Sequence, residues 1–129
     1  MTDSPAGQCA WILEKFQEWA DCDDDPVGVL GVDRILDNVM AYWLTATAAS
    51  SARLYWENVR RPTWEPTGVP MGAAIFAKEI YRPSRRWAAP YFIDIRRWNE
   101  ITVGGHFAAF EQPKIFVEEL RAFWRDVRS

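Results

Sequence analysis

Apolar residues in the first half of the chain recur every three or four positions, the spacing of one face of a helix. A first helix is predicted from Pro5 to about Ala20, because Ser4 can cap it and proline is favoured in a first helical turn. A second helix is predicted to follow a cap at Asp33. Its apolar face is formed by four residues, Leu36, Val39, Met40 and Trp43. A third helix is predicted to end near Asn58.

The pattern changes in the second half, where short apolar segments alternate with helical ones. Residues 69–76 are apolar and rich in small side chains, and Pro70 stands near their start, where a strand tolerates it. We interpret them as a parallel strand buried on both faces. A second strand is predicted over residues 94–103. A short helix is predicted within residues 82–90, and a longer one begins at Pro113.

This order of elements predicts an α/β fold, in which helices are followed by a βαβα unit that requires a parallel sheet. Two parallel strands do not form a stable sheet alone, because such strands need both faces covered and neighbours at their edges. We therefore expect the C-terminal portion of a larger doubly wound fold, with an incomplete parallel sheet. Residues 1–68 are expected to form its helical segment and residues 69–129 its βαβα segment.

Composition and charge narrow the class of protein. Of the 129 residues, 49% are hydrophobic and 26% charged, as in ordinary soluble domains, and we expect many of the eight tryptophans in an interior or a ligand cavity. A net charge of −3 argues against nucleic acid as a partner, and the short arginine clusters are interpreted as surface ion-pair partners. Without a secretory signal pattern or an apolar run of ~18 residues, we expect a cytoplasmic protein and no membrane partner.

Metal chemistry has little support in the sequence. Cys9 and Cys22 are the only cysteines and His106 is the only histidine, too few ligands for a structural zinc site. The cysteines are interpreted as two buried free thiols, although the sequence also permits a disulfide. The acidic run from Asp21 to Pro26 lacks the alternation and the glycine of a calcium loop, and we interpret it as a solvated loop.

The candidate chemistry lies where the two predicted strands end. His106 follows the second strand and the pair Gly104-Gly105, at the sheet edge where ligands of open α/β folds gather, although a lone histidine is also often structural. Glu79 follows the first strand, so both side chains can emerge at one edge. This is the acid-then-histidine order of an α/β-hydrolase triad. The alternative for Glu79 is a surface carboxylate paired with Lys78 or Arg82.

Four parts of the sequence resemble the C-terminal part of microsomal-type epoxide hydrolases, and the resemblance extends over essentially the whole chain. They are DSPAG with WILEKF near the N-terminus, DNVMAYWLT at residues 37–45, SSARLYWEN at residues 50–58, and GGHFAAFEQP at residues 104–113. The third of these contains Tyr55, an aromatic helix residue that packing alone would explain. Only the resemblance suggests a functional role for it.

The resemblance implies an α/β-hydrolase fold that hydrolyses a small-molecule epoxide to a vicinal diol, without a cofactor or a metal. In that family the position of His106 holds the water-activating base, and the position of Glu79 holds its acid partner. The position of Tyr55 holds one of two tyrosines that hydrogen-bond the epoxide oxygen. An aspartate attacks a ring carbon to form an ester, which the activated water hydrolyses. Detoxification and aromatic hydrocarbon catabolism are the implied settings.

The chain departs from the family because the aspartate nucleophile, the oxyanion-hole segment, the first tyrosine and most of the sheet are expected upstream. No aspartate of residues 21–25 is predicted on a strand-to-helix elbow. We therefore expect a fragment that is inactive alone and needs an N-terminal half. The alternative is a non-enzymatic remnant that dimerises or associates through a sheet edge and apolar surface. A relative that acts on an ester or haloalkane is a third interpretation.

Overall fold

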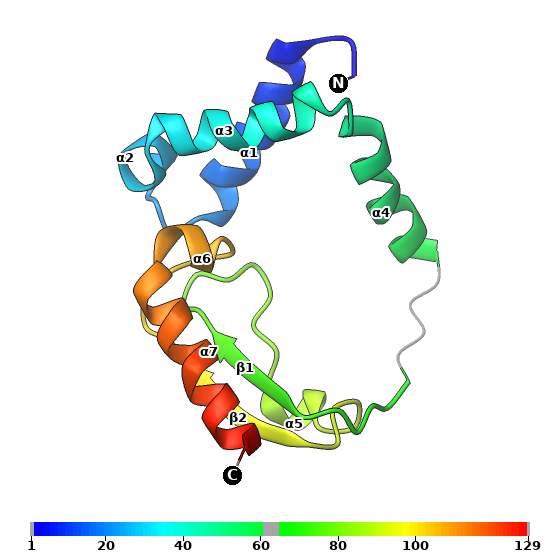
Figure 1. The fold of residues 1–129 in the computed structure, drawn as a ribbon, viewed down its shortest axis with the longest axis vertical. Coiled ribbons are helices and arrows are strands. Elements are labelled where there is room, and N and C mark those ends of the chain that lie inside the picture. Colours follow the sequence, from blue (N-terminus) through cyan, green and yellow to red (C-terminus); the bar gives the residue numbers. More distant parts are fainter. Residues whose placement is uncertain (1, 61–64, 129) are drawn as a thin grey trace. The chain divides into compact units, whose positions relative to one another are not determined.

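A computed structural model describes residues 2–60 and 65–128 of the chain (Figure 1). The chain divides into two compact units, and each is described by itself. In the described part, the first unit comprises residues 2–18 and 22–60, and the second comprises residues 19–21 and 65–128. The short segment 19–21 therefore belongs with the second half of the sequence, although it lies near the beginning of the chain.

The helices of the first half agree with the predicted order and add a short one. They are α1 Pro5–Trp19, α2 Pro26–Leu30, α3 Val32–Leu44 and α4 Ala48–Arg60. The hydroxyl of Ser4 accepts a hydrogen bond from the amide of Gly7 at 3.1 Å, as a cap of α1 should. The helix that the sequence missed, α2, begins after Asp25, whose carboxylate accepts a hydrogen bond from the amide of Gly28 at 2.9 Å. With five residues, α2 is too short to show a helical period.

The start and the buried face of α3 differ from the prediction. The cap residue is Gly31, so Asp33 lies in the first turn, where its charge suits the helix dipole. Ile35 and Val39 are the buried residues of α3, whereas Leu36 is 45% exposed. The buried stripe is thus displaced from the predicted one, because several apolar residues of α3 could each have faced the core.

The second unit contains a two-stranded sheet and its helices. In chain order they are β1 Met71–Ile75, α5 Arg85–Ala88, β2 Ile95–Glu100, α6 Ala108–Glu111 and α7 Pro113–Arg128. The strands pair in parallel from Met71 opposite Ile95 to Ile75 opposite Glu100, with an irregularity after Met71. The predicted α/β class and incomplete parallel sheet are confirmed within the described residues. The four-residue helix α6 was not predicted.

The long helix α7 packs on this sheet (Figure 1). A Cβ atom at Gly72 would lie 2.6 Å from the Phe123 ring, so the glycine allows α7 to approach β1 closely. Arg97 of β2 donates two hydrogen bonds to Glu119 of α7, at 2.8 and 3.1 Å, and Asn99 donates a third at 2.8 Å. The Arg97 guanidinium is the main cause that lowers the pKa of the Glu119 carboxyl.

Burial of β1 is less complete than predicted. Ile75 and Phe76 are buried, but the rest of the strand is partly exposed and Val69 before it is 67% exposed. The prediction of a strand covered on both faces is therefore wrong for the chain as described, because the other elements of the second unit leave part of the surface of β1 uncovered. Within residues 2–60 and 65–128, no helix is both long enough and apolar enough to cross a membrane.

Candidate active site

Glu79 and His106 meet just beyond the carboxyl ends of the two strands. A single parallel bridge pairs Lys78 with Gly105, and the amide of Lys78 donates a hydrogen bond to the carbonyl of Gly104 at 2.9 Å. This bridge continues the strand pairing after β1 and β2 have ended. Glu79 directly follows Lys78, and His106 directly follows Gly105. Oε1 of Glu79 lies 2.6 Å from Nδ1 of His106.

The contact has the chemistry of a carboxylate that orients an imidazole. An ionised carboxylate only accepts hydrogen bonds, so Nδ1 of His106 is the donor and, in the neutral ring, Nε2 keeps the free electron pair. The alternative partners of Glu79 bind elsewhere. Lys78 forms an ion pair with Asp21 at 2.8 Å, and Arg82 lies 3.9 Å from Glu100. The geometry therefore favours the His106 pairing over a surface ion pair.

Aromatic rings restrict the histidine ring on two sides. The ring of Trp19 meets it edge-on with a centroid distance of 5.3 Å, and the ring of Phe107 does so at 5.2 Å. The backbone amide of His106 donates to the carbonyl of Trp19 at 2.9 Å. The end of α1 thus belongs to the surroundings of His106, and at least one tryptophan lines the candidate site.

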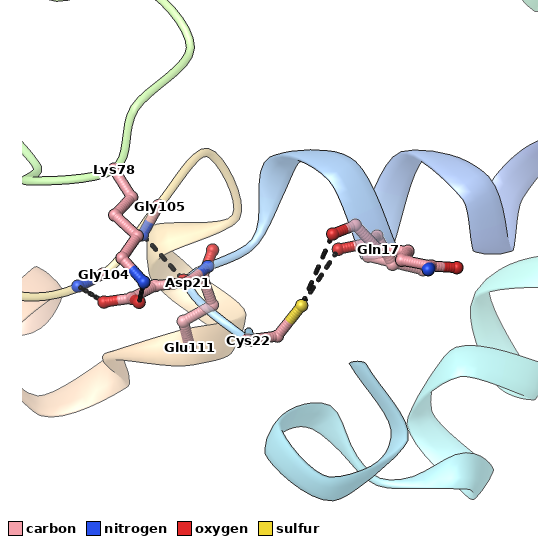
Figure 2. Close-up of polar contacts among 8 residues, drawn as sticks. Gln17, Asp21, Cys22, Lys78, Gly104, Gly105 and Glu111 are labelled. Atoms are coloured by element: carbon pink, nitrogen blue, oxygen red, sulfur yellow. Dashed lines mark hydrogen bonds and ion pairs between the residues drawn. The ribbon is translucent and has the colours of Figure 1, made fainter. Parts of the chain in front are cut away.

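Asp21 is a member of the site that the sequence analysis missed (Figure 2). Its carboxylate accepts a hydrogen bond from the amide of Gly104 at 2.9 Å and pairs with the ammonium of Lys78 at 2.8 Å. The hydrogen bond from Lys78, followed by the one from Gly104, lowers the pKa of the Asp21 carboxyl. The interpretation of this residue as part of a solvated loop is wrong, because its partners lie more than 50 residues away in the sequence and come close only in the fold.

Glu111 is the second missed member (Figure 2). Its Oε2 accepts hydrogen bonds from the amides of Gly105 at 2.7 Å and Asp21 at 2.8 Å, and its Oε1 accepts one from the amide of Phe107 at 2.8 Å. One sequence signal pointed to this region. A Cβ atom at Gly105 would lie 2.6 Å from the carbonyl oxygen of Trp19, so the glycine pair marks a close approach of two backbone segments.

The third predicted site residue, Tyr55, lies on α4 in the first unit and is 56% exposed. Its predicted role toward the epoxide oxygen stays a prediction. Glu79 and His106, by contrast, are brought together within the second unit.

Both cysteines are free thiols. Cys22 is buried, with Sγ 3.5 Å from the carbonyl oxygen of Gln17 (Figure 2), whereas Cys9 is only partly buried, so the expectation of two buried thiols is right for Cys22 alone. In the part of the chain that the structure describes, no cluster of three histidine, cysteine or acidic side chains could bind a metal ion.

The chain is similar to curated proteins over its full length. A putative epoxide hydrolase of Stigmatella aurantiaca is 48% identical over 130 residues, which cover 100% of this chain and 30% of the relative. Epoxide hydrolase 1 of Sus scrofa is 33% identical over 95% of this chain and 30% of its own length. The chain thus spans about a third of the length of these relatives. No protein-family model matches it.

The chain is also similar to solved structures of epoxide hydrolases. The crystal structure of juvenile hormone epoxide hydrolase from the silkworm Bombyx mori superposes with a TM-score of 0.89 and 30% identity, over 98% of this chain and 35% of the other. An enantioselective mutant of the Aspergillus niger epoxide hydrolase gives a TM-score of 0.80 and 32% identity, over 96% of this chain and 31% of the other. Over its whole length, this chain is therefore a homologue of the C-terminal part of the epoxide hydrolases and has that part of their α/β-hydrolase fold.

Proposed function

We propose that this chain supplies the water-activating part of an epoxide hydrolase, with His106 as the general base and Glu79 as its acid partner. The observation that supports the proposal most directly is the 2.6 Å contact between Oε1 of Glu79 and Nδ1 of His106. It occurs in a chain whose relatives are named epoxide hydrolases. A small-molecule epoxide is accordingly the proposed substrate.

The proposed step is hydrolysis of an ester formed when a carboxylate outside this chain opens the epoxide. Nε2 of His106 removes a proton from water as the water oxygen attacks the ester carbonyl. Glu79 keeps the ring oriented through Nδ1 and stabilises the imidazolium that forms. The tetrahedral intermediate then releases the diol alkoxide, which takes the proton from the His106 imidazolium, and the carboxylic acid left behind loses its proton to regenerate the carboxylate. The side chain of His106 is 37% exposed, so water can reach the ring.

Tyr55 is the proposed hydrogen-bond donor to the epoxide oxygen, which becomes an alkoxide when the ring opens. Its exposure of 56% in this chain leaves the side chain accessible to a ligand or to a further protein segment. This assignment rests on the sequence resemblance and on that accessibility.

We further propose that the chain is inactive alone and acts together with an N-terminal half. In support, the chain spans about 30% of its relatives. Several large apolar side chains are also at least two-thirds exposed, and these are Leu44, Val69, Tyr81, Trp87 and Ile93. Exposed apolar surface of this kind favours association. Repeated turnover of styrene oxide by the purified chain would contradict this part of the proposal.

The same exposed side chains favour a second candidate, in which the chain is a non-catalytic module that forms a homodimer. Size-exclusion chromatography with light scattering distinguishes the two. A stable dimer that remains inactive when joined to an N-terminal half supports the second candidate.

A chimera tests the proposed chemistry. In it, this chain replaces the matching part of the Stigmatella aurantiaca relative, and diol formation from styrene oxide is measured. His106→Ala should lower kcat by about 10²- to 10⁴-fold, the usual contribution of a general base. It should also leave a covalent adduct heavier than the protein by the mass of the epoxide, because ring opening precedes the step that needs the base. Glu118→Gln changes an exposed glutamate of α7 and is the control. An active His106→Ala chimera without an adduct would show that the assigned base is wrong.

A further inference from the structure

The backbone around His106 is fixed by an unusual set of hydrogen bonds. Four consecutive amides, those of residues 104–107, all donate to acceptors outside this loop. Gly104 donates to Asp21 at 2.9 Å and His106 to the carbonyl of Trp19 at 2.9 Å. Gly105 and Phe107, the residues on either side of His106, both donate to Glu111, at 2.7 and 2.8 Å. Three of the four acceptors are therefore carboxylate oxygens.

Glu111 uses both of its carboxylate oxygens to bracket His106. Oε2 binds the amide before the histidine and Oε1 binds the amide after it. Oε2 also accepts from the amide of Asp21, which joins the loop to segment 19–21. A glutamine could not replace this arrangement, because one of its two terminal atoms is a donor and would face an amide N–H.

The loop lies between regular elements, and the bridge between Lys78 and Gly105 holds one part of it. Strand β2 ends at Glu100, and α6 begins only at Ala108. Gly104 has a φ of +89°, in the left-handed region that other residues rarely adopt. The contact between Glu79 and His106 depends on the position of this backbone, since a displacement of 1 Å would lengthen a 2.6 Å hydrogen bond beyond its normal range.

We propose that Glu111 is a positioning residue for His106, which acts through the amides of Gly105 and Phe107, and that Asp21 assists it through the amide of Gly104. The inference builds on the proposed function, in which His106 must keep one orientation toward Glu79. The effect of Glu111 on the histidine ring does not itself require that His106 acts as a base. The carboxylate of Glu111 selects the ring tautomer indirectly, by fixing the backbone on both sides of the histidine.

The test uses the imidazole itself, because His106 is the only histidine and gives one unambiguous set of NMR signals. The full chain is labelled with ¹⁵N-histidine, and the two ring nitrogens report which of them bears the proton. The wild type should show the Nδ1–H tautomer, with a slowly exchanging Nδ1 proton. Glu111→Gln should give a mixture of tautomers and at least a tenfold faster exchange of that proton. The control Glu118→Gln should match the wild type.

Two further variants separate positioning from charge and from unfolding. Glu111→Asp keeps the charge but is too short to bracket the histidine, so it should resemble Glu111→Gln. Wild-type behaviour of Glu111→Asp would show that charge alone matters and would overturn the proposal. The amide of Ile101, which donates to the carbonyl of Ile75 at 2.8 Å, reports whether the sheet remains folded. Should Glu111→Gln unfold, Asp21→Asn decides the matter, since it is expected to shift the tautomers in the same direction but less.

These measurements need no substrate, so their failure and that of the proposed function can be told apart. In the chimera described above, Glu111→Gln should lower kcat by about 10- to 100-fold with little change in KM, as expected for a misplaced base. An unchanged imidazole spectrum in Glu111→Gln would overturn the positioning role and leave the role of His106 intact. Loss of activity in His106→Ala without an adduct would instead question the function and leave the positioning role intact.

Discussion

The loop around His106 is held by many contacts within this chain, whereas the helix that carries Tyr55 is largely exposed. Each amide of residues 104–107 has an acceptor, and the imidazole has a carboxylate partner and two aromatic neighbours. On α4, the residues Leu54, Tyr55 and Trp56 are all more than half exposed. The ion pair between Arg53 and Glu57 spans 3.9 Å between exposed side chains, a type of pair that contributes little stability.

The two predicted parts of the site therefore differ in what holds their side chains in place. The relation between base and acid follows from contacts within the second unit, and so should respond strongly to changes there. The proposed relation of Tyr55 to the epoxide rests on the sequence resemblance, since this side chain is 56% exposed in the chain. We therefore expect substitutions in the loop to change stability, and a substitution at Tyr55 to change only activity.

The largest effect is expected for Gly105→Ala. The added methyl would lie 2.6 Å from the carbonyl oxygen of Trp19 and 2.8 Å from the amide of Asp21, and neither backbone atom can rotate away. We expect a loss of about 3 kcal/mol in the free energy of unfolding, measured by urea denaturation. Gly68→Ala is the matched control, because a Cβ atom there would meet nothing within 4 Å. Equal stability of the two variants would contradict the close approach of segments 19–21 and 104–107.

A smaller, pH-dependent effect is expected for Asp21→Asn. Lys78, followed by Gly104, lowers the pKa of the Asp21 carboxyl below its usual 3.8, so the charged form stabilises the fold. This contribution is fully present above the usual pKa and is lost as the pH falls through the lowered pKa of the folded protein. The variant should therefore be less stable by about 1–2 kcal/mol at pH 7, and the difference should disappear in strong acid.

Urea denaturation at several pH values between 2 and 7 measures this difference. Asp37→Asn, an exposed position on α3, removes the same charge and should show no such change with pH. A difference for Asp21→Asn that does not shrink below pH 3.8 would mean that ionisation of the carboxyl is not its source.

The smallest effect on stability is expected for Tyr55→Phe. The hydroxyl belongs to a side chain that is 56% exposed, so its removal should change the free energy of unfolding by less than about 0.5 kcal/mol. In the chimera the same substitution should lower kcat by about 10²-fold, as expected for the loss of one donor to a developing alkoxide. Full activity of Tyr55→Phe would remove this residue from the proposed site. A large loss of stability would show that α4 is more constrained than its exposure indicates.

The elements with a clear hydrophobic period, and the order of the catalytic candidates, could be predicted from the sequence alone. The helices α1, α3, α4 and α7 and both strands were predicted, because each is long enough for its hydrophobic spacing to be visible. The placement of Glu79 and His106 at one sheet edge also followed from order, since one crossover connects parallel strands in a nearly fixed way. The four-residue helix α5 was also predicted, within residues 82–90. The short helices α2 and α6 were missed, as five or four residues contain little more than one turn and show no period.

The support of His106, by contrast, could not be predicted before the fold was known. Asp21 and Gly104 are 83 positions apart, and Asp21 and Glu111 are 90 positions apart, yet they are hydrogen-bonded. In the sequence Asp21 is one of several adjacent acids, and Glu111 is a polar residue before Pro113. Nothing local distinguishes them, because their partners are backbone amides, which every residue except proline has. Such an acceptor is identified only when the fold brings a particular amide within reach.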